Sequence, residues 1–444
     1  MRAKIRRFSR LKSEPRIEGK SAQYTLRHCG VVRCAPDGQI RIKVAEGVGY
    51  AEGVVHCGSV HCCPVCGAVI RTRRSVIYQD SAKRWLDDSN WVYMVTLTFP
   101  HYMGDDLARM WDLVSGGAGY LTSNRRWYKL RDELGCRPLP RPLFVADSVG
   151  EAERVTRWDE CDIGYRRVIE CTWGCENAFH PHCHMLVYLR NTEATDALDG
   201  AERLAKITAH FWQSWLRWVT HTCKDCGKAI RAGRGCPFAR RSRLVVRSEV
   251  PCGCRCECGG PGYPPPSAGY GAKVEQCYAA DKAAEYLVKT QDGKGVGMEL
   301  ARGDLKKGRK DSLTPFEIAD RAGDGEEQFL KLWWTWEKAS KGRKMTTESQ
   351  GLARMLGEVE ITDQELADED AGGEEVAAVT GQTWANACAH RCADAGRNPA
   401  AARNGLEAAV FEAAVAGGLA GVNEVLHAHG CGWAYVPPPR EEGG

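Results

Sequence analysis

The hydrophobic and polar positions predict three β-strands in the first half of the chain, at residues 91–99, 165–172 and 180–188. In the first of them, Val95 and Leu97 alternate with threonines, which is the period-two pattern of a strand with one buried face. A short glycine-containing turn separates the second strand from the third. We therefore expect these two strands to pair as an antiparallel hairpin.

Helices are predicted along the rest of the chain, and at residues 192–220 the apolar residues recur at spacings of three and four. The predicted helices occupy residues 105–133, 192–220, 275–290 and 381–428, and a basic helix starts within residues 70–77. Another helix begins after Thr314, a suitable N-cap that is followed by Pro315 at the first helical position and Glu317 at the third. Residues 136–161 are expected to be an irregular insertion. Together these elements predict an α+β fold, with a central antiparallel sheet flanked by helices.

The length of 444 residues suggests two or three domains, and the hydrophobic content of 43% is enough for sizeable cores. The chain shows no run of 18 or more apolar residues, so we expect no transmembrane helix. The basic N-terminus lacks the apolar stretch of a secretory signal. These features predict a cytoplasmic protein.

Charge is distributed unevenly along the chain. The net charge is +4, but residues 358–375 hold nine acidic side chains and no basic one, so the rest of the chain carries +13. Basic clusters occur at residues 2–16, 231–247 and 302–310. A basic body favours a polyanionic partner such as DNA, although an ordinary solvated surface is the alternative.

Cysteine is unusually frequent, with 22 residues, and clustered thiols in a reducing compartment indicate zinc rather than disulfides. In the first cluster, two cysteines separated by Pro64 and Val65 form a tight knuckle, and further cysteines precede it. The expected ligands are Cys29, Cys57, Cys63 and Cys66, with Cys34 and Cys62 as alternatives. Four sulfurs leave no open coordination position, so such a zinc site is structural. The alternative is a group of free or redox-active thiols.

A second cysteine-rich segment at residues 221–270 is expected to be a loop excursion held by another zinc ion. Its candidate ligands are Cys223, Cys226, Cys252, Cys254, Cys256 and Cys258. The last four alternate with other residues and cannot easily all serve one tetrahedral ion, so the choice among them stays open. Arginines in this segment make it a candidate contact with DNA.

The third predicted strand carries an unusual concentration of imidazoles. His180, His182 and His184 alternate along it and therefore share one face. Two imidazoles side by side on a rigid strand can hold one divalent cation. Pairing with the second strand would bring Glu170 within reach of the same cation. The alternatives are three exposed histidines on an edge strand and a solvated glutamate.

The predicted helix at residues 275–290 places two tyrosines and two lysines on one face. They are Tyr278, Lys282, Tyr286 and Lys289, at spacings of four, four and three. A phenol has a pKa of about 10, so it acts as a nucleophile only beside a positive charge or a base. Lys289 lies one turn from Tyr286 and could provide that charge. The alternative is aromatic packing with solvated lysines.

These motifs, in this order, resemble the HUH endonuclease superfamily, specifically the plasmid rolling-circle replication initiator (Rep) proteins. The resemblance extends to initiators of actinobacterial plasmids and covers about residues 25–375. The segment 57–70 resembles their N-terminal cysteine motif. Residues 314–317, 342–344 and 361–367 resemble their C-terminal signatures.

The resemblance implies an HUH-type central sheet and a metal-assisted nicking reaction. His182 and His184, with Glu170, would hold Mg2+ or Mn2+. Tyr286 would attack the scissile phosphate, with Lys289 stabilising charge, to give a 5′-phosphotyrosine link and a 3′ hydroxyl that primes synthesis. The second attacker or base for rejoining the displaced strand stays open between Tyr278, Glu285 and Asp281.

The expected organisation is five segments in chain order. They are a basic flexible N-terminus at 1–20, a cysteine-rich zinc module at 21–80, an HUH nickase domain at 81–310 with its insert at 221–270, a helical C-terminal region at 311–357, and an acidic linker with an Ala-rich helical tail at 358–444. The implied partners are double- and single-stranded plasmid origin DNA, a host helicase and a DNA polymerase, with no membrane.

Other functions fit parts of the same pattern. A conjugative relaxase or a single-strand transposase of the same superfamily would use the same active site. A non-catalytic zinc-dependent DNA-binding regulator would bind an origin without becoming covalently attached to it. In a zinc-stabilised scaffold, the histidine strand would have no catalytic role.

Overall fold

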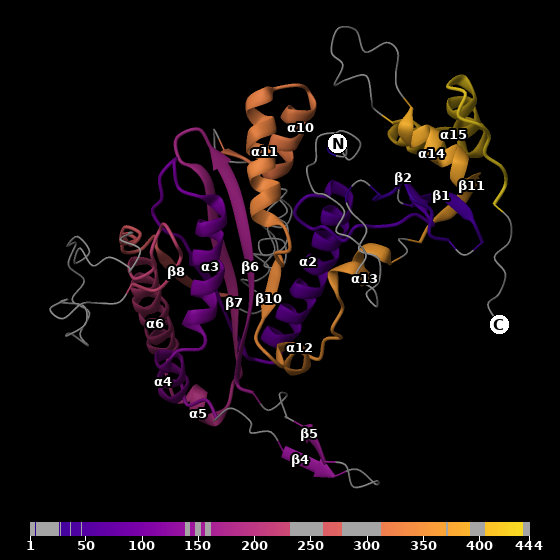
Figure 1. Ribbon diagram of the computed structural model, residues 1–444. Coiled ribbons are helices and arrows are strands. Elements are labelled where there is room, and N and C mark those ends of the chain that lie inside the picture. Colours follow the sequence, from indigo (N-terminus) through magenta and orange to yellow (C-terminus); the bar gives the residue numbers. More distant parts are fainter. Residues whose placement is uncertain are drawn as a thin grey trace. The chain divides into compact units, whose positions relative to one another are not determined.

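The computed structural model of the chain divides into two compact units (Figure 1). The first comprises Met1–Ile70, Pro315–Lys341 and Ile361–Gly444, and the second comprises Arg71–Thr314 and Gly342–Glu360. The structure describes residues 5, 26, 28–35, 37–45, 47–137, 161–230, 261–277, 312–369, 372–390 and 405–437, with the backbone alone at 143–146 and 152–155. The five segments expected from the sequence stay a prediction.

An antiparallel sheet forms the centre of the second unit. Its strands lie in the order β10 (Thr346–Glu348), β6 (Ile163–Gly174), β7 (Ala178–Leu189), β3 (Trp91–Leu97) and β8 (Ala272–Cys277), and β9 (Ser312–Leu313) also pairs with β6. The predicted hairpin of the second and third strands is therefore confirmed. β7 lies between β6 and β3, so both of its edges are hydrogen-bonded and its side chains are held rigidly.

Three helices, α3 (Leu107–Leu121), α4 (Arg125–Glu133) and α6 (Gly200–Thr220), lie on one side of this sheet (Figure 1). They bury aromatic side chains such as Trp111 and Trp215. The predicted helices at 105–133 and 192–220 are each split by an internal N-cap. Asn124 caps α4, and Asp199 caps α6 after the short α5 (Glu193–Asp196). The α+β class is confirmed.

The C-terminal part of α2 (Pro64–Asp87) packs on the sheet of the second unit through aromatic and charged contacts. Arg166 of β6 is fully buried, stacks 3.9 Å from the Tyr78 ring centroid, and pairs with Glu348 and Glu358. In the sheet register, Arg166 lies opposite Leu186, one side-chain pair beyond His184 on the same face. The α2 contacts therefore lie next to the histidine end of that face.

Two local predictions for the second unit need correction. In the insertion at 136–161, expected to be irregular, β4 (Leu143–Ala146) and β5 (Ala152–Val155) form an antiparallel hairpin. The helix expected at 275–290 cannot begin at Glu275, because residues 272–277 form β8 and pair in register with β3. The alternation of Ala272 and Val274 with charged residues is a strand pattern. Residues 278–290 lie outside the described part of the chain.

The first unit contains a three-stranded antiparallel sheet in the order β11 (Glu374–Thr380), β1 (Gln39–Ala45), β2 (Val48–Glu52). Helices α14 (Gly381–Ala389) and α15 (Glu407–Ala428) pack against it around the buried Trp384. The helical prediction for 381–428 is confirmed for these two segments. Residues 374–380, expected within an acidic linker, instead form an edge strand because their apolar positions complete the core below α15.

Three further helices, α10 (Pro315–Gly323), α11 (Glu327–Ser340) and α13 (Asp363–Asp368), belong to the first unit. α10 and α11 pack against each other, and α10 begins at Pro315, as predicted from Thr314. α13 starts with a capping box between Thr362 and Glu365.

In the second unit, α12 (Leu352–Met355) lies so close to Gly164 that a Cβ there would meet Leu352 at 2.8 Å.

Among the described residues, α15 is long and apolar enough to cross a membrane by length and composition, with a mean hydropathy of 1.4. Core helices of soluble proteins pass the same test. Val410, Ala414, Val422 and Leu426 belong to the hydrophobic core of the first unit, and the backbone is non-helical at Gly418. These features are those of a helix that packs on a sheet.

Candidate metal centres

The first candidate centre lies on the sheet of the second unit, where Glu170 of β6 pairs directly with His182 of β7. Glu170 Oε2 lies 3.3 Å from His182 Nε2 and 3.5 Å from His184 Nε2. The three donor atoms lie within 4.8 Å of one another. The structure therefore brings together the three residues that the sequence predicted to share a cation.

These separations fit a small divalent cation. With ligand bonds of about 2.1 Å, neighbouring ligand atoms lie about 3.0 Å apart in an octahedron and about 3.4 Å apart in a tetrahedron. Glu170 and His184 are buried and His182 is half-buried. One carboxylate and two imidazoles are a donor set that suits several divalent metals.

The orientation of both imidazoles is set by their other ring nitrogen. His184 Nδ1 lies 3.1 Å from Thr96 Oγ1, and His182 Nδ1 lies 3.3 Å from the carbonyl oxygen of His180. If each Nδ1 carries the proton and donates it to that oxygen, each Nε2 presents its lone pair toward Glu170. The sequence pattern alone does not reveal this role of Thr96, which depends on the pairing of Thr96 with His184 across β3 and β7.

The electrostatics of this cluster keep the carboxylate ionised. Burial by itself raises the pKa of Glu170, but when no cation is bound, hydrogen bonds from His182 and His184 and the charge of these imidazoles outweigh it, so its pKa lies well below 4.5. A carboxylate that is ionised at neutral pH is the form that binds a cation.

A second histidine pair extends this row of imidazoles. His101, which follows β3, lies with its Nε2 2.6 Å from His180 Nδ1, and their rings stack. Burial first, and then the charges of His182 and His101, lower the pKa of His180 to about 3. His180 is thus neutral at physiological pH and leaves the neighbouring site without an extra positive charge.

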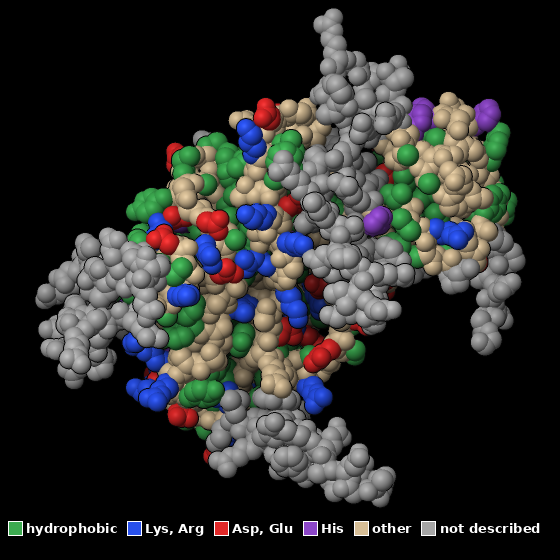
Figure 2. Space-filling model, viewed as in Figure 1, with side chains coloured by type: hydrophobic (Ala, Val, Ile, Leu, Met, Phe, Trp, Pro, Cys, Tyr) green, Lys and Arg blue, Asp and Glu red, His purple; other side chains and the backbone are tan. Residues whose placement is uncertain are grey.

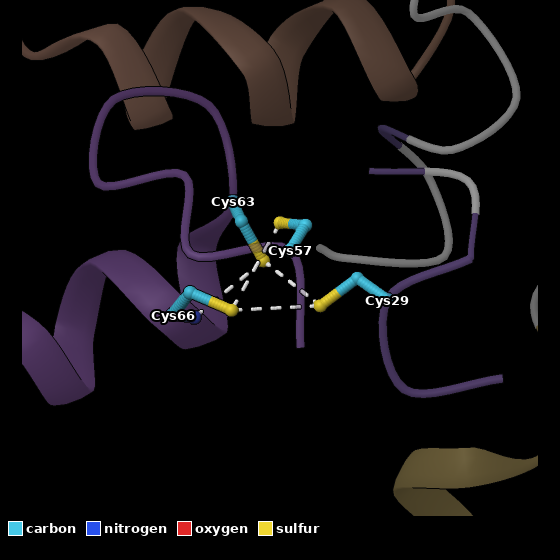
Figure 3. Close-up of side chains that lie close together, drawn as sticks. All are labelled: Cys29, Cys57, Cys63 and Cys66. Atoms are coloured by element: carbon cyan, nitrogen blue, oxygen red, sulfur yellow. Dashed lines mark hydrogen bonds between the residues drawn. The ribbon is translucent and has the colours of Figure 1, made fainter. Parts of the chain in front are cut away.

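The second candidate centre, in the first unit, consists of Cys29, Cys57, Cys63 and Cys66 (Figure 3). Cys29 Sγ lies 3.6 Å from Cys63 Sγ and 3.5 Å from Cys66 Sγ, and Cys57 Sγ lies 3.9 Å from Cys66 Sγ. Four sulfurs at 2.3 Å from a tetrahedral zinc ion are about 3.8 Å apart. The four predicted ligands therefore converge at the size of a zinc site.

The cysteine centre lies in an environment that favours protonated thiols when no cation is bound. The pKa of Cys63 is raised well above its usual range, first by hydrogen bonding to Cys29 and also by burial. Cys66 donates its backbone N–H to Cys63 Sγ, as expected for the first turn of a knuckle that leads into α2. Zinc binding would release these protons and would couple metal affinity to folding.

The alternative thiols lie outside this cluster. Cys34 is exposed, and Cys62 Sγ lies 3.4 Å from the hydroxyl of Ser340 in α11. The geometry therefore separates the four converging cysteines from the two neighbours that the sequence alone left as alternatives.

Two helices from the C-terminal half of the chain contact the cysteine loop, and one of them, α13, overlaps the signature segment at 361–367. Trp336 of α11 donates its indole N–H to the carbonyl of His61 at 2.9 Å. Gln364 of α13 donates to the carbonyl of His56 at 3.3 Å, next to Cys57. Gly58 has a φ of +60°, and a Cβ there would lie 2.4 Å from Gln364 Oε1. Segments far apart in the sequence therefore position one zinc-type loop.

Cys223 and Cys226 begin the second cysteine-rich segment in a tight turn. Cys223 accepts a backbone hydrogen bond from Gly227 at 2.9 Å, and Gly227 has a φ of +72°, which an L-residue rarely adopts. Cys223 is buried and Cys226 is half-buried. The other predicted ligands, Cys252, Cys254, Cys256 and Cys258, lie outside the described residues.

The proposed nucleophile region also lies outside the described residues. This applies to Tyr278, Asp281, Glu285, Tyr286 and Lys289, as well as to the basic clusters at 2–16, 231–247 and 302–310, of which only Ile5 is described. Strand β8 ends at Cys277, immediately before this region, and lies next to β3 in the same sheet as the Glu170 cluster.

Two known proteins are similar to this chain. "Protein rep" of Streptomyces lividans is 28% identical over 384 residues, which span 78% of this chain and 75% of that protein. "Neomycin resistance protein" of Streptomyces cyanogenus is 28% identical over 162 residues, or 34% of this chain and 35% of that protein. No family model matches the chain, and no solved structure matches it. The first similarity supports the Rep-type interpretation of the sequence.

Proposed function

We propose that this protein is a plasmid rolling-circle replication initiator that nicks one strand of its origin DNA. The observation that carries the proposal is the convergence of Glu170, His182 and His184 on neighbouring strands of one sheet. The similarity to a protein named "Protein rep" supports the biological role. The Streptomyces origin of both relatives agrees with the actinobacterial type of initiator that the sequence resembles.

Glu170, His182 and His184 would hold Mg2+ or Mn2+ at the sheet. When bound, this ion would polarise the scissile phosphate and stabilise the charge that develops on its oxygens. The chain's own contribution is orientation. Thr96 and the carbonyl of His180 hold the two imidazoles, and the ionised Glu170 balances positive charge at the site.

Tyr286 is the proposed nucleophile. Its phenolic oxygen attacks the phosphorus, the bond from phosphorus to the 3′ oxygen breaks, and the leaving oxygen takes up a proton to become the 3′ hydroxyl that primes synthesis. Lys289 would lower the cost of forming the phenolate. The phosphotyrosine link is then attacked when the displaced strand is rejoined, by Tyr278 or by water activated by Glu285 or Asp281. These assignments rest on the sequence.

The cysteine clusters would bind structural zinc. Cys29, Cys57, Cys63 and Cys66 would hold one ion, and Cys223 and Cys226 would hold a second with ligands from Cys252, Cys254, Cys256 and Cys258. The proposed partners are double- and single-stranded origin DNA, a host helicase and a DNA polymerase. We place this activity in the cytoplasm.

Nicking of the supercoiled parental plasmid in the presence of Mn2+ tests the proposal. Wild-type protein is expected to relax the plasmid and leave a denaturant-resistant protein–DNA adduct. Tyr286→Phe is expected to abolish the adduct, whereas Tyr270→Phe, which removes the hydroxyl of an exposed tyrosine, should keep it. Omission of Mn2+, rather than chelation, separates this metal from structural zinc.

The metal ligands are tested in the same assay. A His182→Ala/His184→Ala variant is expected to bind origin DNA and to keep its zinc content but not to nick. An adduct that survives in Tyr286→Phe would move the nucleophile, with Tyr278 the next candidate. Origin binding with neither nick nor adduct, with Mg2+ or Mn2+ and also with single-stranded substrate, would replace the nickase by a non-catalytic regulator. Transfer of unrelated single strands would favour a relaxase or transposase.

A further inference from the structure

A third group of nitrogen and sulfur donors lies at the C-terminal ends of α14 and α15 in the first unit. Each helix ends in a histidine at its C-cap, His390 for α14 and His429 for α15. Their ring centroids are 4.7 Å apart in an edge-on arrangement. Cys431 Sγ lies 4.0 Å from His390 Nδ1. This group is separate from Glu170 and from the four clustered cysteines.

The backbone around Cys431 is held in place independently of the side chain. Cys431 donates its N–H to the carbonyl of Leu426 at 2.9 Å, and its carbonyl accepts from Asn386 of α14 at 3.4 Å. Asn423 of α15 hydrogen-bonds both the N–H and the carbonyl of Ala434, at 2.7 and 3.0 Å. The thiol is therefore presented from a fixed segment that already joins the two helices.

Burial and helix polarity suit a cation at this position. Cys431 is 4% exposed, whereas His390 is half-buried and His429 is exposed, so the group lies at the surface with its sulfur inside. Figure 2 shows histidine side chains at the surface over α14 and α15. Two helix C-termini meet here, and the unsatisfied carbonyls of a helix C-terminus carry partial negative charge.

We propose that His390, His429 and Cys431 form a binding site for a borderline transition-metal ion, with Zn2+ as the best fit. A thiolate and two imidazoles select such ions over Mg2+ and Ca2+, which prefer oxygen. In a tetrahedral zinc site, sulfur and nitrogen ligands lie about 3.6 Å apart, so the 4.0 Å separation needs only a small closure. His429 is exposed, and its ring would have to turn from its edge-on contact with His390 to bring a nitrogen to the same ion.

Neighbouring donors have other contacts and are left out of the proposed site. Cys388 Sγ contacts the carbonyl of Gly30 at 3.9 Å. The His427 ring packs on Trp433 with a centroid separation of 4.5 Å. Among the described residues, the proposed site therefore has three ligands, which leaves a fourth coordination position. Without metal, the Cys431 thiol makes a weak contact with the carbonyl of His429 at 3.6 Å.

The consequence of this site is a crosslink between the two helices and the sheet. Tyr435, four residues after Cys431, exchanges both backbone hydrogen bonds with Ala378 of β11, at 2.8 and 2.9 Å. A metal ion at Cys431 would connect α14, α15 and the β11 edge. Small cores gain much of their stability from such staples. The proposed nicking reaction does not depend on this site, and either proposal can fail without the other.

Metal content of the full-length protein tests the site. Cys431→Ser and His429→Gln are each expected to lower the zinc content by one ion per chain, measured by inductively coupled plasma mass spectrometry. His427→Gln is the matched control, because it removes an exposed imidazole from the same helix end. Cys34→Ser controls for loss of an exposed thiol. Both controls are expected to keep the wild-type content.

Cobalt substitution gives a second readout. Co2+-loaded wild type is expected to show thiolate-to-cobalt charge-transfer absorption that loses the contribution of one thiolate in Cys431→Ser, while the signal of the four-cysteine site remains. Unchanged zinc content and an unchanged cobalt spectrum in folded Cys431→Ser and His429→Gln would overturn the proposal. If Cys431→Ser fails to fold, His429→Gln decides the question, because its side chain is exposed.

Discussion

Two oxygens orient the imidazoles of His184 and His182 toward Glu170. One is the hydroxyl oxygen of Thr96, and the other is the backbone carbonyl oxygen of His180. The Thr96 hydroxyl lies 3.1 Å from Nδ1 of His184, and when this nitrogen donates its proton to Thr96, the other ring nitrogen is left available to a cation. The backbone carbonyl of His180 has the same relation to His182. The proposed site therefore requires the correct tautomer of each imidazole as well as the correct position of each ring.

Thr96→Val is expected to lower metal affinity and nicking by about 10- to 100-fold, because His184 loses the partner that orients it. The measurement is the Mn2+ dependence of nicking together with the melting temperature. Thr98→Val is the matched control, since the Thr98 hydroxyl donates to the carbonyl of Tyr270 and contacts no histidine in the described residues. Equal losses in both variants would contradict an orienting role for Thr96.

His180→Gln is expected to flatten the pH dependence of stability. The pKa of His180 falls from 6.5 to about 3 on folding, mainly by burial. Between these two pKa values, the unfolded chain binds more protons at His180 than the folded chain does. The free energy of unfolding therefore decreases as the pH is lowered from 6.5 toward 3, and above pH 6.5 His180 causes no decrease. His101 and His210 shift in the same direction, so the slope should decrease but not vanish.

Urea unfolding between pH 4.5 and 6.5, without added divalent ions, measures this slope. The lower limit keeps the titration of Glu170, whose pKa lies well below 4.5, from dominating the result. If His180→Gln shows the same pH dependence of the free energy of unfolding as the wild type, then His180 is protonated to the same extent in the folded and unfolded states.

At the scale of elements, short segments distant in sequence hold the cysteine loop from two sides. α11 reaches the loop through Trp336 and Ser340, and α13 reaches it through Gln364. Gln364, which belongs to the segment 361–367 that resembles a signature of plasmid initiators, thus contacts the loop of a zinc-type site. Arg343, from another signature, instead pairs with Asp112 of α3 at 2.7 Å in the second unit.

Gly58→Ala is expected to destabilise the first unit and to accelerate zinc release. Any L-residue at this φ of +60° costs about 1–2 kcal/mol, and the new Cβ would also displace the Gln364 side chain. Gly47→Ala is the matched control, because Gly47 has a φ of +75° with no atom within 4 Å of its Cβ position. Melting temperature and zinc release to a chromogenic chelator measure the difference.

A Gly58→Ala/Gln364→Ala double variant separates the cost of the backbone conformation from the cost of the clash with the Gln364 side chain. If the contact with Gln364 matters, the two substitutions are expected to be non-additive, since the clash disappears with the side chain. Simple additivity would mean that only the backbone conformation of Gly58 is responsible.

At the scale of the whole molecule, the two units depend on different sources of stability. The second unit has a sheet covered by long amphipathic helices, with Trp111, Phe211 and Trp215 buried. The first unit combines a three-stranded sheet with the cysteine centre, and its described chain comes from three separate stretches of sequence. Small cores of this kind commonly need metal ions for stability.

Removal of zinc by a strong chelator is therefore expected to loosen the first unit selectively. Hydrogen exchange followed by mass spectrometry should show faster exchange in α11 and in the segment around Cys57, with β7 and β3 still protected. Added zinc should restore protection. Equal loss of protection in β7 would mean that the two units unfold as one cooperative body.

The sequence by itself determined the features that depend on local period and local chemistry. Strands β3, β6 and β7 follow from alternation, and the helices α3, α4 and α6 follow from spacings of three and four. The antiparallel partner of His182 was also predictable, because a short turn limits the register of a hairpin and brings Glu170 opposite it. The cysteine knuckle followed from the spacing of Cys63 and Cys66.

Only the tertiary structure decided which distant segments meet. Nothing local indicates that β11 pairs with β1, that Thr96 lies against His184, or that the ends of α14 and α15 bring His390 close to His429. These contacts depend on how apolar faces from all parts of a unit are buried together. Because this burial depends on the whole chain, these contacts cannot be predicted from any short segment of the sequence.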